Sequence, residues 1–358
     1  MNEIIYVPII KTADAEVRAL ENLSDAVRNM TTPLLEFTRS RTTAKLKRGD
    51  ILRKVKRLSE LFKERVFFLD LTNDPNLTND QIKELQSNVN GYKNWTDFAV
   101  ARKSDFSKFI PTIQISSENI ATEDEHYKRI RQQVGVLGRN FEKLLYRIPI
   151  GYEFIARDMA EIGKHVPANR LICLLDAEYI PKDKAPIYAR NAIPIIQEFK
   201  KYSPASIIIA STSFPKKPTQ YGGESEGRMF LEERIFYKKI KETEKNIVYG
   251  DYATIHPARN DQSGGNGWVP RIDMPTADEV FYFRDRKTKA EATYANAYIR
   301  VAEKVAETKD YQGIRKKISG CWGIKQIESA ESGLPQGLSP SFWISVRMNI
   351  HISLTVTP

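Results

Sequence analysis

Charged and polar side chains recur at the ends of short apolar segments along this chain. Alternate residues share one face of a β-strand, so one such side chain per segment is predicted to face inward at a comparable depth. These residues are Lys11, Glu36, Asp70, Gln114, Arg147, Asp176, Ser211 and Asp251. Their spacing predicts that acids and bases far apart in the chain meet at one rim.

Carboxylates dominate this predicted rim. Burying an unpaired carboxylate costs several kcal/mol or more, so we expect each acid to pair with a cation or to serve a site. His256 follows the last of the apolar segments and is the histidine best placed to act as a general acid or base. The candidate catalytic residues are therefore Lys11, Glu36, Asp70, Arg147, Asp176, Asp251 and His256. The alternative is a set of structural ion pairs.

The same acids suggest a metal site. Oxygen ligands suit a divalent ion such as Mg²⁺, for which Glu36, Asp70 and Asp176 are the candidate ligands. A zinc site is disfavoured, because the four histidines of the chain form no H-x-H or H-E-x-x-H arrangement.

Two glycine- or lysine-bearing loops and one arginine suggest phosphate binding. Glycine exposes backbone amides, and nearby cations add attraction for a phosphate-bearing ligand. The candidate phosphate- or nucleic-acid-binding residues are Arg39, Lys216, Lys217, Gly264 and Gly265. The alternative is that these loops are merely flexible.

The elements that must position these side chains are strands alternating with helices. The expected strands cover residues 6–10, 33–37, 66–71, 109–115, 145–150, 170–179, 206–211 and 246–252. Strands joined by helices pair in parallel, and eight such units close a barrel. An open doubly wound sheet is disfavoured, because no glycine fingerprint follows the first strand. The sequence predicts an α/β fold, a TIM-like (β/α)8 barrel.

Two further segments complete the predicted architecture. Residues 269–286 resemble a β-hairpin inserted before the last helix, which is expected at about residues 289–308. Residues 309–358 lie outside the eight units and carry several aromatic residues. We therefore expect a barrel over residues 1–308 and a C-terminal extension over residues 309–358 packed on it.

Composition narrows the class of protein. The chain has 358 residues, a net charge of +10 and two cysteines, which suits a reducing compartment without disulfide bonds. No signal peptide and no membrane-spanning segment is evident, so a cytoplasmic protein without membrane contact is expected. Basic residues gather between Arg39 and Arg65, which suggests nucleic-acid binding, with a solvated helix face as the alternative.

Several short motifs resemble the beta protein family of prophages and satellite phages. They lie at residues 6–12, 14–16, 32–36 and 174–176, and in a tail that contains Trp343, Val346-Arg347, Asn349 and His351-Ile352. The family takes its name from a phage protein encoded beside a lethal protein whose killing it suppresses. The resemblance implies a role in toxin control or phage defence and a protein partner from an adjacent gene. It supplies no catalytic residues.

Three functions stay open at this point. The first is an antitoxin-like or regulatory component of a prophage-encoded defence module, built on a barrel with a polar ligand pocket. The second is a metal-assisted hydrolase of a nucleotide or phosphate ester. The third is a nucleic-acid-binding protein that uses the basic segment over residues 39–65.

Overall fold

Eight parallel strands form the central sheet of the computed structural model, which describes residues 4–44, 47–116, 122–259 and 267–357. The strand order is β4-β3-β2-β1-β9-β7-β6-β5. The two outer strands also meet, because Thr112 bridges Leu145 in parallel and the amide of Ile113 donates to the carbonyl of Leu145 at 2.8 Å. The sheet is thereby a nearly closed barrel, as predicted. The strands are β1 (Tyr6–Lys11), β2 (Leu34–Phe37), β3 (Phe67–Leu71), β4 (Phe109–Pro111), β5 (Leu144–Pro149), β6 (Leu171–Tyr179), β7 (Ser206–Thr212) and β9 (Val248–Asp251).

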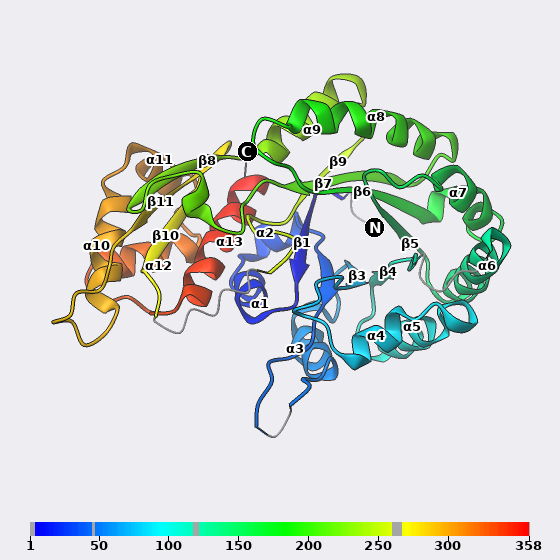
Figure 1. Cartoon of the computed structure of the whole chain (residues 1–358), viewed down its shortest axis with the longest axis horizontal. Helices are drawn as coiled ribbons and strands as arrows, with labels where there is room; N and C mark the ends of the chain where they lie inside the picture. The colour runs from blue at the N-terminus through cyan, green and yellow to red at the C-terminus, as the bar shows by residue number, and fades with distance from the viewer. Residues whose placement is uncertain (1–3, 45–46, 117–121, 260–266, 358) are drawn as a thin grey trace.

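Helices between the strands cover the outside of the barrel (Figure 1). Several begin at a side chain that caps the free amides of the first turn, as Ser24, Asn79 and Thr122 do. The helices up to β9 are α1 (Asp14–Glu21), α2 (Asp25–Asn29), α3 (Leu52–Phe62), α4 (Asp80–Gln86), α5 (Val89–Ala101), α6 (Glu123–Asn140), α7 (Ile155–Gly163), α8 (Ala185–Lys201) and α9 (Glu232–Thr243), with short 3-10 turns η1 (Arg102–Ser104), η2 (Ala168–Arg170) and η3 (Pro218–Gln220).

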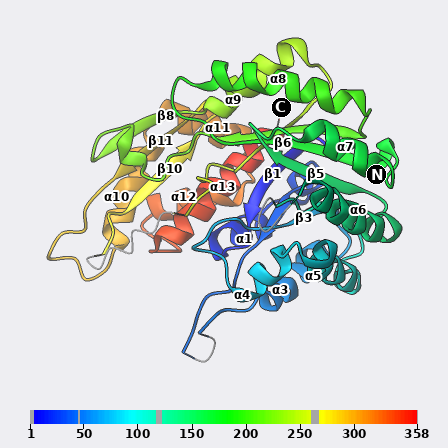
Figure 2. The same cartoon turned by 45° about the vertical axis from the view of Figure 1, so that its right-hand side comes forward.

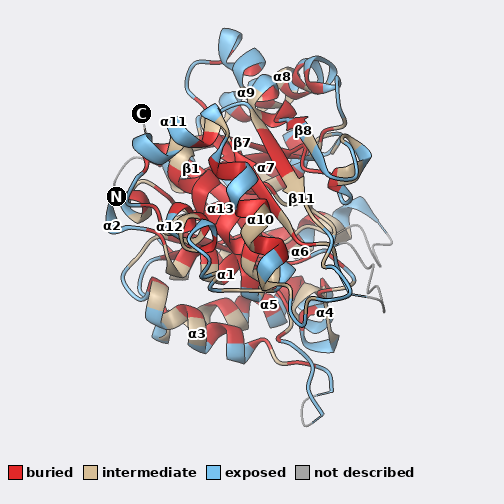
Figure 3. Cartoon of the chain, turned by 90° about the vertical axis from the view of Figure 1, so that its left-hand side faces the viewer, coloured by how far each residue is buried: buried red, intermediate tan, exposed pale blue. Residues whose placement is uncertain are grey.

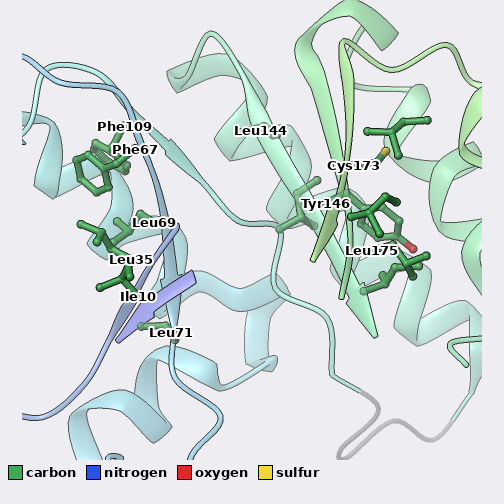
Figure 4. Packing of buried hydrophobic residues seen from close by; sticks show 14 of the residues in the cluster. Ile10, Leu35, Phe67, Leu69, Leu71, Phe109, Leu144, Tyr146, Cys173 and Leu175 are labelled. Carbon is green, nitrogen blue, oxygen red and sulfur yellow. The ribbon is translucent and has the colours of Figure 1, made fainter. Parts of the chain in front are cut away.

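Alternation along the strands separates two apolar layers. Side chains that face outward, such as Ile10, Leu35 and Leu175, pack against the helices (Figure 4). Side chains that face inward fill the barrel, among them Val7, Ile9, Leu34, Phe68, Leu145, Ile172, Leu174 and Ile208. Gly250 occupies the inward position on β9, where an added Cβ would lie 2.8 Å from the carbonyl oxygen of Val7. Close packing of the interior therefore leaves no room for a side chain there.

A second, smaller sheet stands beside the barrel, on the left in Figure 1. Strands β10 (Arg271–Pro275) and β11 (Glu279–Arg284) form the predicted hairpin, and β8 (Glu226–Phe230) adds to β11 in antiparallel fashion. Strand β8 was not expected. Met229 lies in this strand, and α9 begins only at Glu232. Helices α10 (Ala295–Ala306), α11 (Lys309–Lys317) and α12 (Trp322–Glu331) complete this unit.

Helix α13 (Pro340–Val356) lies between the barrel and the small sheet (Figures 1 and 2). It contacts α1 and β1 on one side and β10 and α12 on the other. Every residue from Ser345 to Ser353 is buried, and the helix lies at the centre of the view in Figure 3. Helix α13, rather than the predicted segment 289–308, therefore lies beside α1 on the barrel wall, whereas α10 packs on β10 and α12. The domain boundary between residues 308 and 309 stays a prediction.

Candidate functional site at the barrel mouth

Arg147 is the centre of a polar cluster at the carboxyl ends of the barrel strands. It extends from β5 into the barrel, where its Nη1 lies 2.8 Å from Glu36 Oε1 and 2.9 Å from Asp70 Oδ2. Its Nε and Nη2 donate to Asp176 Oδ2 at 3.0 and 2.6 Å. Three carboxylates from β2, β3 and β6 thus share one guanidinium. Parallel register explains the meeting, because Glu36 is the partner of Asp70 across the β2–β3 pair.

Neutral groups hold the same carboxylates. The hydroxyl of Tyr252 donates to Asp176 Oδ2 at 2.7 Å, and the side-chain amide of Gln114 donates to Asp70 Oδ1 at 2.8 Å. Backbone amides supply the remaining partners: that of Leu71 donates to Asp70 Oδ1, and that of Glu178 donates to Asp176 Oδ1, both at 2.8 Å. These bonds fix the orientation of both acids.

Burial and charge act in opposite directions on this cluster. Glu36, Asp70 and Asp176 are only 5%, 6% and 3% exposed. Burial raises the pKa of Glu36 above its ordinary value, although Arg147 and Lys11 act against the rise. Burial alone would lower the pKa of Arg147, but the carboxylates, led by Asp176, raise it well above its ordinary value. The guanidinium of Arg147 is therefore firmly charged.

Lys11 is paired with a neighbouring acid that sequence reasoning missed. Its Nζ lies 3.0 Å from Asp74 Oδ2 and also donates to the carbonyl of Pro257. Asp74 accepts further bonds from the amides of Arg259 and Asn76, at 2.6 and 3.0 Å. Although burial opposes it, these donors and Lys11 lower the pKa of Asp74. The contact joins the loop after β3 to the loop after β9.

The rim beyond the cluster carries His256, Glu178 and two tyrosines. The rings of His256 and Tyr179 have centroids 4.8 Å apart, and the hydroxyls of Tyr179 and Tyr221 lie 3.1 Å apart. His256 Nδ1 lies 3.0 Å from both the amide nitrogen and the carbonyl oxygen of Ala258. Burial lowers the pKa of His256, so its ring is neutral at pH 7. Glu178 is exposed and has a left-handed φ of 51°, next to a register shift in β6.

Asp251 does not join the cluster. Gly250 takes the inward position on β9, so Asp251 faces the helices, where it accepts from Tyr6 and Tyr249 hydroxyls at 2.6 and 2.9 Å and lies 2.6 Å from His351 Nε2 of α13. Although burial opposes it, His351 holds the pKa of Asp251 well below its usual range. The predicted inward orientation of Asp251 is wrong.

Ser211 also has the opposite orientation to the one predicted, because Ile208 and Ala210 are the inward residues of β7. The interior of the barrel sets this phase, since an inward side chain must fit among its neighbours. The inward predictions for Lys11, Glu36, Asp70, Gln114, Arg147 and Asp176 agree with the observed contacts.

The candidate phosphate-binding residues are scattered. Arg39 donates to the carbonyl of Asn76 at 3.2 Å in the loop after β2, and Lys216 and Lys217 are exposed after β7. Gly264 and Gly265 lie outside the described residues. The structure places none of the described three within the Arg147 cluster, and their assignment stays a prediction.

Within the described ranges, no group of three or more His, Cys, Asp or Glu side chains has the arrangement of a metal site. The guanidinium of Arg147 lies where Glu36, Asp70 and Asp176 converge, which is the place a shared metal ion would take. In this arrangement the three carboxylates do not fit a shared Mg²⁺ ion.

Comparison with known proteins identifies the family. Residues 6–357 match the family model described as Beta protein. The chain belongs to the beta protein family. Protein beta of Enterobacteria phage P4 is 27% identical to it over 354 residues, which cover 97% of this chain and 92% of that protein.

Two solved structures resemble this beta protein family member more distantly. A chitinase from Chromobacterium violaceum has a TM-score of 0.36 at 10% identity, over 97% of this chain and 99% of that chain. The spore cortex-lytic enzyme SleL from Bacillus megaterium has a TM-score of 0.35 at 11% identity, over 96% and 73%. Similarities this low carry no argument about activity.

The tail motif that resembled the beta protein family has a structural place in α13. Asn349 donates to the carbonyl of Ala19 at 3.0 Å and accepts from the amide of Gly323 at 2.9 Å. Arg347 pairs with Asp273 of β10 at 2.5 Å. These bonds tie α13 to α1, α12 and the small sheet. They account for buried polar residues in an otherwise apolar helix.

Four basic side chains of the segment over residues 39–65 form ion pairs, namely Arg48, Lys54, Arg57 and Arg65, whereas others such as Arg53, Lys56 and Lys63 are exposed. Arg57 contacts both Asp14 and Glu21, and Arg65 contacts Asp25. The acidic partners neutralise the positive charge of Arg57 and Arg65, which is then less available to a phosphate. The described helices include none with the length and hydropathy of a membrane span.

Proposed function

We propose that this protein is an antitoxin-like or regulatory component of a phage-encoded defence or toxin-control module, and that it acts through a ligand site at the barrel mouth. Membership of the beta protein family and the likeness to a protein of phage P4 support the phage setting. The observation that carries the proposal is the convergence of Glu36, Asp70 and Asp176 on the single guanidinium of Arg147.

The charge at the mouth is unbalanced, which favours a site over a plain structural ion pair. Three carboxylates share Arg147. Lys11 does not balance them, because it forms its ion pair with Asp74. An excess of buried negative charge is costly unless another positive group or donor compensates for it. A ligand that brings a cationic or hydrogen-bond-donating group meets that need. A bare phosphate would instead be repelled here.

A second candidate function is hydrolysis at the same mouth. The observation in its favour is the pKa of Glu36, which burial raises while its carboxyl lies beside other carboxylates. Pairs of acidic groups whose environments separate their protonation states are the arrangement that acid–base catalysis uses. His256, neutral and at the rim, would add a second proton carrier.

The test is rescue of growth in a bacterial host that also expresses the protein of the neighbouring phage gene. We expect the wild-type chain to restore growth, and Asp176→Asn and Glu178→Gln to lose that ability. Asp176→Asn is expected to keep its melting temperature within a few degrees, because Arg147 retains Glu36 and Asp70 as partners. Glu178 is exposed, so its substitution should cost no stability.

Asp97→Asn is the matched control, since Asp97 is an exposed carboxylate on α5 away from the mouth. Failure of the wild-type chain to restore growth would overturn the toxin-control role. Full rescue by both mouth variants would overturn the role of the mouth. A large drop in the melting temperature of Asp176→Asn would identify the cluster as a structural ion-pair network.

A further inference from the structure

A hollow of about 690 Å³ opens at the end of the barrel opposite the Arg147 cluster. Residues just before or at the start of five strands line it, among them Ile4, Pro33, Val66, Phe109 and Lys143. The hollow therefore lies at the amino ends of β1 to β5. Its volume is in the range of pockets that hold small molecules.

Positive charge dominates the lining of this hollow. Five cationic side chains border it, against the two acids Glu64 and Glu142, which leaves an excess of three positive charges. The cations are Arg28, Arg65, Lys103, Lys108 and Lys143. They come from four different connections between helix and strand. The fold, rather than one basic stretch of sequence, brings them together.

The five cationic side chains differ in whether they already form ion pairs or hydrogen bonds within the protein. Arg28 and Arg65 share Asp25, and Lys103 donates to the carbonyl of Asn140 at 2.8 Å. Lys108 and Lys143 show no ion pair or hydrogen bond to the described residues. The ammonium groups of Lys108 and Lys143 can therefore bind a ligand without breaking an ion pair or hydrogen bond within the protein.

We propose that this hollow binds a small phosphate-bearing molecule. Phosphate oxygens accept charge-assisted hydrogen bonds from lysine and arginine, and several cations around one concavity suit a ligand with more than one negative charge. Partly exposed apolar side chains, Leu61 and Val66, give an organic portion of the ligand a surface to contact. The site is independent of the mouth, because the barrel interior separates the two ends.

A small ligand fits these observations better than a nucleic acid. Four aromatic side chains border the hollow: Phe62, Phe106, Phe109 and Phe141. They are almost fully buried and offer no face for base stacking. Single-strand binders combine a basic groove with such platforms. A hollow of about 690 Å³ also matches one small molecule more closely than a polymer backbone.

The experiment is calorimetric titration of the full chain with ATP, AMP, pyrophosphate and adenosine, in the presence of a metal chelator. We expect ATP and pyrophosphate to bind, AMP to bind more weakly and adenosine not to bind. Lys108→Gln and Lys143→Gln should each weaken ATP binding about tenfold, the effect of losing one bond to a charged group. Higher salt should weaken binding further.

Lys128→Gln on α6 is the matched control, because it removes an exposed lysine and the same charge away from the hollow. Asp176→Asn should leave the ATP affinity of the hollow unchanged. A failure of the proposal for the hollow is therefore distinguishable from a failure of the proposal for the barrel mouth. The proposal is overturned if neither ATP nor pyrophosphate binds at millimolar concentration, or if the two lysine variants bind as the control does. Tighter binding of an oligonucleotide than of ATP, weakened by the same variants, would assign the hollow to nucleic acid instead.

Discussion

At the scale of single residues, buried acids on the two faces of one barrel wall have different surroundings. Inside the mouth, three carboxylates share Arg147. Behind the sheet, Asp251 is held by His351 and two tyrosines, and Glu233 of α9 lies near it. The second group is sealed between the strands and the helices, so its ionisation bears on stability rather than on ligands.

Glu233 gives a prediction about pH. Burial raises the pKa of Glu233 from an ordinary value of 4.5 to about 7, although Ser213 donates to it. The folded protein then holds a proton that the unfolded chain has released, so this contribution to stability is full below about pH 4.5 and is lost as the pH rises to about 7. Relative to Glu233→Gln, the wild-type free energy of unfolding should fall over that range by up to roughly 3 kcal/mol.

Urea unfolding at a series of pH values measures this difference. Glu303→Gln, at an exposed site on α10, serves as the control and should follow the wild-type curve. Parallel curves for the wild type and Glu233→Gln would show that folding does not raise the pKa of Glu233.

At the scale of elements, α13 is the helix that joins the two apolar cores. Trp343, Val346 and Ile350 pack in the core of the small sheet, whereas Met348 and Ile352 pack in that of the barrel. A helix that is buried on all sides needs a partner for each polar side chain it carries. Arg347, Asn349 and His351 find such partners in Asp273, Ala19 and Asp251.

Asn349→Ala should therefore destabilise the protein strongly. The substitution leaves the carbonyl of Ala19 and the amide of Gly323 without this side chain, and it removes the contact with Cys321. At about 1 kcal/mol for each lost bond, the free energy of unfolding should fall by about 2–4 kcal/mol. Urea unfolding at pH 7 is the measurement.

The control for Asn349→Ala is Asn94→Ala, where one exposed bond to the carbonyl of Glu84 is lost. Its effect should stay below about 0.5 kcal/mol. An Asn349→Ala protein as stable as the control would mean that α13 is held by apolar packing alone.

At the scale of the whole molecule, the end of the chain returns to its beginning. Helix α13 contacts α1 and β1, after the chain has built the small sheet and three further helices. Strand β9 lies beside β1 in the barrel and is joined to α13 by the Asp251–His351 pair. The barrel wall and the small sheet thus depend on the same helix.

A chain cut after residue 308 should consequently fail to fold as a stable barrel. It would lack α13 and expose the apolar faces of α1 and β10 that α13 covers. We expect no cooperative thermal transition by circular dichroism. The control is the full chain with a protease site between Thr308 and Lys309, cut after folding, which should melt cooperatively. A cooperative melt of residues 1–308 near the wild-type temperature would show that they form an independent domain.

Local patterns were enough for most elements and for part of the site. The eight strands follow from apolar segments between helical periodicities, and Glu36, Asp70, Arg147 and Asp176 follow from alternation once the strand phase is right. Alternation failed for Asp251, since the interior requires glycine at position 250. The sequence did not predict the role of Asp74, which lies in a loop. A loop has no alternation of side chains that would indicate that the Asp74 carboxylate faces Lys11.

The order of residues alone determined that this chain alternates strand and helix eight times and that charged groups stand at the strand ends, because periodicity and capping act over a few neighbours. The tertiary structure decided which acids share Arg147, which helix of the last hundred residues lies beside α1, and that lysines from separate loops gather at the opposite end. These outcomes depend on contacts between residues that lie from 29 to 330 positions apart in the chain. No local pattern encodes such contacts, because each apolar face is compatible with many partners until the whole barrel closes.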